Sequence, residues 1–298
     1  MVHIPVLLKE VLDYLKPRNG FFMLDCTVGA GGHSKEILQR IMPDGILIGI
    51  DKDEDILRIA GQNLKEFEGH FFLFKKDFVG IDSILDTLHS LPLTGKIKSF
   101  DGMLFDLGVS SFQIDSARRG FSFSVDGPLD MRMDKEQDLS AYTIVNRWTK
   151  DEIADVLFNY GGERFSRKVA SGIIEKRKKH PIKTTFELSN IILSVIKKRG
   201  KIHPATRTFQ ALRIAVNEEL STLEKSLPKA IQVLARCGRI CVISFHSLED
   251  RIVKRTFKKY EKQGIINILT TKPIRPSLEE TRVNPRARSS ILRAAEKR

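Results

Sequence analysis

The chain has 298 residues, which is enough for one large domain or two modest ones. Hydrophobic residues make up 41% of it and charged residues 29%, so it can bury a sizeable core beneath a charged surface. The net charge of +13 is high for a metabolic enzyme of this size. It favours a polyanionic partner, nucleic acid above all, over a basic surface that only contacts solvent.

The N-terminal segment, residues 6–15, has apolar residues at helical spacing interrupted by charges. It predicts an amphipathic helix and not a signal peptide. No apolar stretch in the sequence is long enough to span a bilayer, so we expect a cytoplasmic protein with no membrane partner. Cys26, Cys237 and Cys241 have apolar neighbours, and the last two are four residues apart with no third and fourth ligand nearby. The pattern indicates neither a disulfide framework nor a zinc site. We expect no metal.

The first motif is an apolar run that leads into a glycine cluster and then a helical pattern, over residues 21–41. It predicts a strand, a glycine turn that a ligand can approach closely, and a helix with free N–H groups at its start. A second apolar run ends in Asp51, twenty residues after Gly31, where an acid can accept hydrogen bonds from both ribose hydroxyls. The glycine turn and Asp51 together favour a nucleoside-binding site over a turn that has only a structural role. They do not separate NAD from S-adenosylmethionine.

Two more strands are predicted at 71–74 and 100–105, with helical segments between the strands. Repeated β-α-β units imply a parallel sheet with helices on both faces, and ligands bind such sheets at the carboxyl ends of the strands. An acid stands at or beside each of these ends: Asp25, Asp51, Asp77 and Asp106. Each acid alone could simply cap the helix that follows it, but together they indicate a binding edge.

Residues 114–205 interrupt this alternation with a mostly helical segment. Capping boxes beginning at Thr149 and Thr184 predict two of its helices. A long helix over 211–234, restarting near Pro228, then leads back to the α/β pattern.

The chain is therefore divided into three segments: 1–113 as the first part of the core, 114–205 as a helical insert, and 206–298 as the second part. The insert carries eighteen Lys or Arg against twelve Asp or Glu, and the chain from 251 onward carries fourteen against four. We predict that the insert recognises a polyanionic substrate and that the C-terminal segment is basic. The alternative for both is a solvated basic face.

Asp106 opens a polar turn, residues 106–111, after the fourth strand. In methyltransferases that act on the exocyclic amines of bases, a polar side chain lies at this place. The lone pair of a cytosine amine is conjugated with the ring and is a poor nucleophile. Acceptors for its N–H groups favour a pyramidal nitrogen, and a carboxylate can remove the surplus proton. Asp106 is therefore the candidate catalytic residue. The alternative is that it only holds the turn.

Six motifs occur in order along the chain: 3–8, 29–34, 106–111 with Gln113, 127–133, 243–251 and 284–289. Together they resemble the RsmH (MraW) family, the bacterial 16S ribosomal RNA cytosine N4-methyltransferases. The resemblance runs from the third residue almost to the last. It implies an α/β fold, with a Rossmann-like class I S-adenosylmethionine-dependent methyltransferase sheet and a helical insert domain.

The resemblance also implies an activity, the N4-methylation of a cytosine in the decoding (P-site) region of 16S ribosomal RNA within the small ribosomal subunit. S-adenosylmethionine is the implied cofactor. Its implied contacts are Gly31, Gly32, His33, Asp51, Phe78, Asp106 and Gln113. The first three form a loop against its methionine end, Asp51 binds the ribose, and Phe78 packs on the adenine. Asp106 and Gln113 close the site near the reacting end.

Several of these residues also have structural interpretations. His33 and His246 could be satisfied structural residues, and Phe78 could belong to the core. No aromatic residue follows Asp106 directly, and the sequence does not decide whether Phe112, Phe121 or Phe123 stacks on the base. Two other functions remain: a non-catalytic RNA-binding ribosome-assembly factor on a methyltransferase fold, and an NAD-dependent oxidoreductase. The oligomeric state is open, a homodimer included.

Overall fold

The computed structural model describes residues 4–90, 94–95, 97–197 and 202–298. His3, the first residue of the N-terminal motif, lies outside these ranges, as do Lys198, Arg199 and Lys201 of the basic insert. The chain forms two compact units, Met1–Gly108 with Leu220–Arg298, and Val109–Glu219. Among the described residues, every helix is too short or too polar to cross a lipid bilayer.

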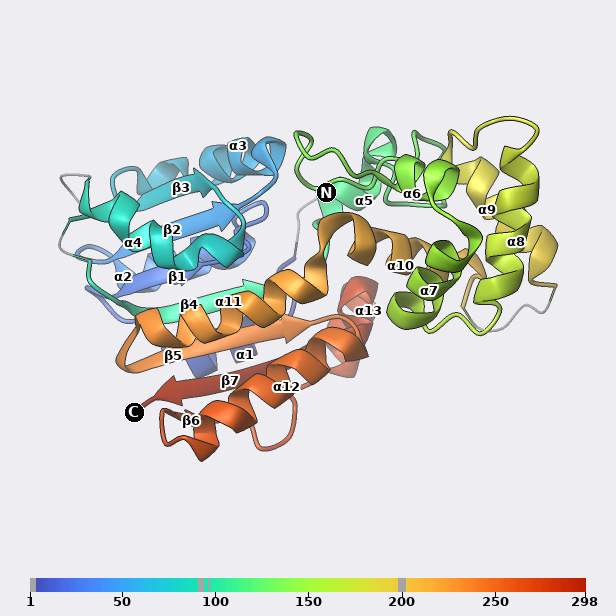
Figure 1. Ribbon diagram of the computed structural model, residues 1–298. Helices are drawn as coiled ribbons and strands as arrows, with labels where there is room; N and C mark the ends of the chain where they lie inside the picture. The colour runs from blue at the N-terminus through green and yellow to red at the C-terminus, as the bar shows by residue number, and fades with distance from the viewer. Residues whose placement is uncertain (1–3, 91–93, 96, 198–201) are drawn as a thin grey trace. The chain divides into compact units, whose positions relative to one another are not determined.

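The first unit is built on a seven-stranded sheet in the order β3-β2-β1-β4-β5-β7-β6 (Figure 1). Its strands are β1 (Phe22–Asp25), β2 (Ile46–Asp51), β3 (Phe71–Lys75), β4 (Phe100–Asp106), β5 (Leu234–Ser244), β6 (Ile266–Ile268) and β7 (Ile291–Lys297). Strands β1 to β5 are parallel, and β7 runs antiparallel to both β5 and β6. This arrangement confirms the predicted Rossmann-like α/β sheet.

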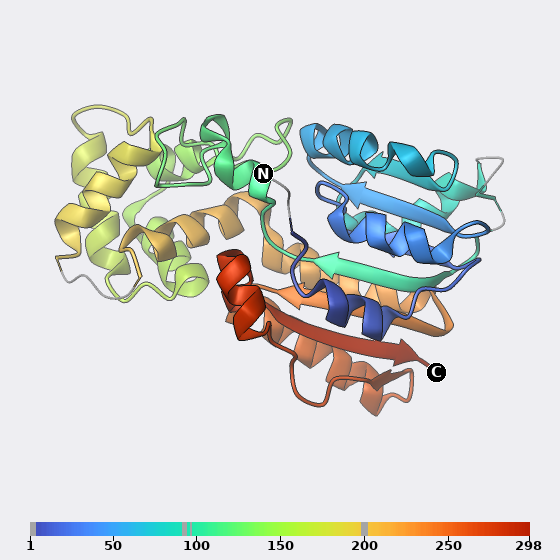
Figure 2. The same ribbon diagram turned by 180° about the vertical axis from the view of Figure 1, so that it is seen from behind.

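Helices cover both faces of the sheet because its central strands are apolar on both sides. The helices of this unit are α1 (Leu8–Leu15), α2 (Gly32–Ile41), α3 (Glu54–Asn63), α4 (Ile81–His89), α11 (Glu219–Val233), α12 (Ser247–Lys262) and α13 (Leu278–Val283). Leu24 and Phe105 pack in one core cluster with α4, α11 and α12. Leu47 and Leu104 pack in another with α1 and α2, which lie over the opposite face in Figure 2. The strand ends are thereby held in fixed register.

The second unit is helical, as predicted for the insert. Its helices are α5 (Ser111–Asp115), α6 (Ala141–Arg147), α7 (Lys150–Gly161), α8 (Ser166–Arg177), α9 (Thr185–Val195) and α10 (Ala205–Asn217). The capping boxes at Thr149 and Thr184 are both present, at the starts of α7 and α9. Apolar residues spaced along α7, α8 and α9 form its own core, which includes Leu157, Ile173 and Ile192.

The units divide after Gly108 and after Glu219, whereas the sequence placed the divisions after residues 113 and 205. The second difference is larger because α10 buries Phe209 and Leu212 in the core of the second unit. The predicted helix restart near Pro228 is wrong. Pro228 lies inside α11, and the chain instead breaks at Glu218, which has a left-handed φ of 50°.

The break at Glu218 has a cause that lies far away in the sequence. The side-chain amide of Asn217 donates to the carbonyl of Met131, and its oxygen accepts from the N–H of Met133, both at 2.8 Å. These bonds replace the continuation of the helix and fix α10 to the loop before α6.

Candidate functional site

The glycine turn between β1 and α2 is fixed by the acid at the end of β1. Asp25 is buried, and its carboxylate accepts from the N–H of Thr27 at 3.1 Å and from the hydroxyl of Ser34 at 2.7 Å. Burial raises the pKa of Asp25 to about 6. Asp25 therefore ties the strand end to the first turn of the helix. The sequence placed it at the edge but gave it no role, and Ser34 nine residues later was the signal.

Gly31 is the N-cap of α2, with a left-handed φ of 85° that other residues rarely adopt. A Cβ atom at this position would lie 3.2 Å from Cγ of Leu64. Within the described part of the chain, no side chain caps this end of α2. The turn thus offers a helix N-terminus with backbone N–H donors, a suitable place for the carboxylate of a methionine-like group.

Asp51 ends β2 and joins it to the glycine turn. Its Oδ2 accepts from the N–H of Gly29 at 3.1 Å, and its Oδ1 accepts from the N–H of Asp53 at 3.0 Å. Burial raises the pKa of Asp51 to about 6, against the lowering effect of these two bonds. A carboxylate has about four acceptor positions, so two remain for the ribose hydroxyls. The contacts hold Asp51 in one orientation, and its binding of the ribose stays a prediction.

Phe78 follows Asp77 just beyond the end of β3. The side chain of Asp77 caps the short 3-10 turn η2 (Phe78–Gly80) by accepting from the N–H of Val79 at 3.0 Å. The half-buried ring of Phe78 meets Phe105 of β4 edge to face, with centroids 5.6 Å apart. Phe78 therefore has a core contact on one side, and its stacking on adenine stays a prediction.

Asp106 ends β4, where its backbone N–H donates to the hydroxyl of Thr27 at 2.6 Å. Its Oδ2 lies 3.5 Å from Nδ1 of His33, which is itself buried on α2. Its Oδ1 is buried and has no hydrogen-bond partner among the described residues. Burial, together with repulsion from Asp25 and Glu249, raises the pKa of Asp106 to about 8. A buried acceptor without a hydrogen bond lowers the stability of the folded protein. It therefore indicates a site for a donor that arrives with a ligand.

The structure thus brings four of the predicted residues together at the carboxyl edge of the sheet: Gly31, His33, Asp51 and Asp106. Gln113 belongs to the second unit, where it is buried on α5 and completes a capping box with Ser110. Its side-chain oxygen accepts from the N–H of Ser110 at 3.0 Å. Its predicted place in the cofactor site stays a prediction.

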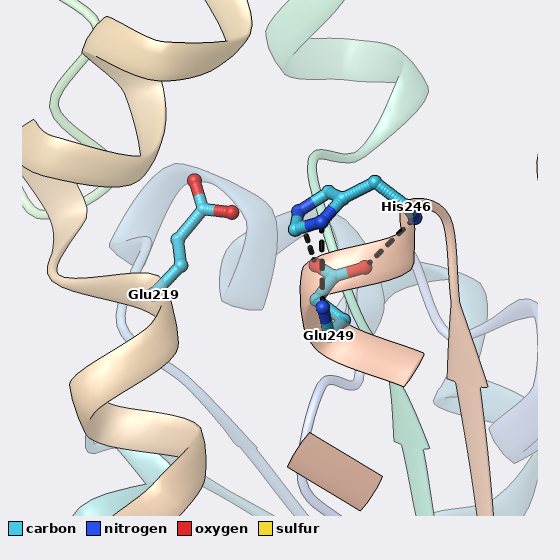
Figure 3. Close-up of side chains that lie close together, drawn as sticks. All are labelled: Glu219, His246 and Glu249. Carbon is cyan, nitrogen blue, oxygen red and sulfur yellow. Dashed lines mark hydrogen bonds and ion pairs between the residues drawn. The ribbon is translucent and has the colours of Figure 1, made fainter. Parts of the chain in front are cut away.

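His246 is the N-cap of α12 (Figure 3). Its Nδ1 accepts from the N–H of Glu249 at 3.4 Å, and Glu249 in turn accepts from the N–H groups of Phe245 and His246. This capping box gives His246 a structural role. Glu249, which the sequence did not single out for the site, acts on it at a distance by raising the pKa of Asp106.

Comparison with known proteins decides the family. The family model of the MraW methylases matches residues 1–298. The chain belongs to this family. The ribosomal RNA small subunit methyltransferase H of Persephonella marina is 48% identical over 99% of both chains. The protein of the same name from Clostridium botulinum is 46% identical over 99% of this chain and 98% of its own. That from Sulfurihydrogenibium is 49% identical over 98% of this chain and 97% of its own.

This membership confirms the predicted family, and it removes the NAD-dependent oxidoreductase that the glycine turn and Asp51 had left open. The seven-stranded sheet is accordingly that of a methyltransferase.

Proposed function

We propose that the chain transfers a methyl group from S-adenosylmethionine to the exocyclic N4 of a cytosine in the decoding (P-site) region of 16S ribosomal RNA. The observation that carries this proposal is the buried Oδ1 of Asp106, an acceptor with no partner among the described residues, at the end of β4 in a methylase. The names of the relatives, each a methyltransferase of small-subunit ribosomal RNA, support the choice of substrate.

The residues at the sheet edge fit the cofactor. Asp51 keeps acceptor positions for the ribose, and the N-terminus of α2 at Gly31 suits the carboxylate of the methionine end. When bound, S-adenosylmethionine would supply a methyl carbon on a positively charged sulfur, a leaving group that would keep the carbon–sulfur bonding pair. Gly31 and Asp51 would thus hold two polar groups of the ligand, the methionine carboxylate and the ribose hydroxyls.

Asp106 acts on the amine. Its Oδ1 accepts a hydrogen bond from an N–H of N4, which draws the nitrogen toward a pyramidal form and frees its lone pair. After the methyl group is in place, N4 carries one hydrogen too many, and Asp106 accepts that proton. The raised pKa of about 8 makes the carboxylate of Asp106 a stronger base than that of an ordinary aspartate.

The surroundings of the three cysteines favour methylation of the exocyclic amine over methylation of a ring carbon. Methylation at C5 of cytosine requires a nucleophile that adds to the ring, ordinarily a thiolate. Cys26 is buried beside Asp25, and burial raises the pKa of its thiol well above the usual range. Cys241 is buried inside β5, and burial raises the pKa of its thiol as well. Cys237 is exposed near the N-terminal end of β5, away from the carboxyl ends of the strands. Cys26 and Cys241 are therefore held as neutral thiols, which are poor nucleophiles for this chemistry.

The RNA-binding surface is proposed from exposed cations. One helix carries a row of them, here called the α12 basic stripe: Arg251, Lys254, Arg255, Lys258, Lys259 and Lys262. They recur every three to four residues, so they share the solvent face of the helix and can follow a phosphate backbone. In the insert, Lys176, Lys178 and Lys179 are exposed, whereas Arg177 donates to the carbonyl of Val145 and is partly buried. The protein would act in the cytoplasm, where its substrate is assembled.

Mass mapping of small-subunit RNA tests the proposal. Small subunits lacking the modification are incubated with the protein and S-adenosylmethionine, the RNA is cut into fragments, and fragment masses are compared with those of an untreated sample. We expect one decoding-region fragment to gain the mass of a single methylene group, and Asp106→Asn to abolish that gain. A methyl group elsewhere in the RNA, or on an adenine, would contradict the proposed substrate. No gain despite measurable cofactor binding would instead favour the assembly factor.

A further inference from the structure

We propose that His33 and Asp106 form a single proton-sharing pair, in which His33 stores the proton that Asp106 takes from the substrate amine. The identity of the amine rests on the proposed function, but the pair itself rests on the geometry of two side chains. Both ring nitrogens of His33 face protein atoms: Nδ1 lies 3.5 Å from Asp106 Oδ2, and Nε2 lies 2.9 Å from the carbonyl oxygen of Val6. His33 acts through Asp106 and is a positioning residue.

The contact with Val6 fixes the tautomer of the ring. A carbonyl oxygen can only accept a hydrogen bond, so Nε2 of His33 carries a hydrogen, and Nδ1 of the neutral ring is then an acceptor. Without a further proton, two acceptors would face each other at 3.5 Å. The arrangement is favourable when the pair holds one proton, carried by Asp106 as the acid or by His33 as the imidazolium. In either form the pair holds one proton and no net charge, which suits a buried site.

The step can be followed proton by proton. When N4 carries its surplus hydrogen, the N–H bond breaks and its electron pair stays on the nitrogen. The proton binds Oδ1 of Asp106, the oxygen that is buried without a partner among the described residues. The proton that Oδ2 of Asp106 shares with His33 then resides on Nδ1 of His33. The pair has gained one proton and one positive charge, which it later releases to water.

The surroundings explain why Asp106 needs such a partner. Burial is the largest cause of its raised pKa, and the carboxylates of Asp25 on β1 and Glu249 on α12 add to it. Cys26, next to Asp25, is held neutral by burial and contributes no charge. Against two like charges Asp106 alone would remain protonated near neutral pH, where it could not act as a base. A neighbouring imidazole that takes up a proton restores that capacity.

Nitrogen NMR of the cofactor-free protein tests the pair without any substrate. His33→Gln identifies the His33 signals by their loss, and Gln keeps a donor toward Val6. We expect hydrogen on Nε2, and an Nδ1 signal that responds to two proton steps in the wild type. Asp106→Asn should remove the upper step and leave one. A hydrogen confined to Nδ1, or the same steps in both proteins, overturns the pair.

The pH dependence of single-turnover methylation tests whether the pair of His33 and Asp106 takes part in the reaction. In His33→Gln, Asp106 must ionise unaided, so the midpoint of the rate profile should move upward by about one pH unit or more. His33→Asn is the second variant and should move it in the same direction. Asp25→Asn keeps an acceptor for the N–H of Thr27, presents a donor that the Ser34 hydroxyl can accept, and removes a like charge, so it should move the midpoint downward. A rate lowered equally at every pH in the His33 variants marks a merely structural residue and overturns the proposal. A two-step NMR titration without cytosine methylation would instead refute the proposed function.

Discussion

Replacing Asp106 by Asn should stabilise the unit that contains the sheet while it abolishes methylation. The carboxyl of Asp106 is buried, its Oδ1 has no partner among the described residues, and its pKa is raised to about 8. An amide has nearly the same shape, carries no charge, and can donate from Nδ2 to Nδ1 of His33. The substitution therefore removes a group that ionises more readily in the unfolded chain than in the folded one.

The size of the effect follows from the difference between the two pKa values. An aspartic acid in an unfolded chain has a pKa of ~3.9, so at neutral pH unfolding releases a proton that the folded carboxyl retains. About three pH units at 1.36 kcal/mol each give a penalty of about 4 kcal/mol, an upper limit because the imidazole of His33 offsets part of it. Because the folded pKa is raised, the penalty is absent below ~pH 4 and grows as pH rises toward the folded value.

Urea unfolding of both proteins across this pH range measures the difference. The two proteins should be equally stable near pH 4, and Asp106→Asn should be more stable by about 2–4 kcal/mol at neutral pH. Circular dichroism follows the whole chain. Trp148, the only tryptophan, lies in the second unit and reports on it separately. A difference that is absent at neutral pH, or that grows toward acid, would refute the interpretation of Asp106 as a carboxyl whose pKa is raised by burial.

Three further predictions concern binding. Asp51→Ala leaves two backbone N–H groups and the ribose without an acceptor, so calorimetry should show cofactor affinity reduced about 10- to 100-fold; unchanged affinity would remove Asp51 from the site. Gly31→Ala should destabilise the protein by about 1–2 kcal/mol and weaken cofactor binding, whereas Gly69→Ala, with a similar φ of 89° but open space around it, should leave binding intact. Alanine at every position of the α12 basic stripe should flatten the salt dependence of small-subunit binding without changing cofactor affinity. Alanine at the three exposed lysines of residues 176–179 tests the insert in the same way. If the salt dependence of binding is unchanged in both variants, these cations contact only solvent.

The sequence predicts the sheet and its binding edge because both are local patterns. Apolar runs of strand length alternate with helical periodicity, and an acid closes each run, so the positions of Asp25, Asp51 and Asp106 at the strand ends follow from parallel pairing. The glycine turn was recognisable for the same reason. The residues that build it, from Asp25 to Ser34, lie within ten positions of one another.

The remaining features depend on contacts between distant parts of the chain. No local pattern shows that Nδ1 of His33 meets Asp106, since more than seventy residues separate them. The limits of the insert were placed differently because the bonds of Asn217 to the backbone around Met131 are invisible in the sequence, whereas Pro228 looks like a break and is accommodated inside α11. The charge state of Asp106 likewise depends on burial and on Glu249, which comes from another helix.

The central claim is that Asp106 directs a methyl group to an exocyclic amine. The most direct measurement supplies S-adenosylmethionine labelled in its methyl group, digests the small-subunit RNA to nucleosides, and separates N4-methylcytidine from C5-methylcytidine by chromatography. We expect the label in N4-methylcytidine with the wild type and in no nucleoside with Asp106→Asn, although that variant still binds the cofactor. Label in C5-methylcytidine, or undiminished N4 labelling by Asp106→Asn, would contradict the claim.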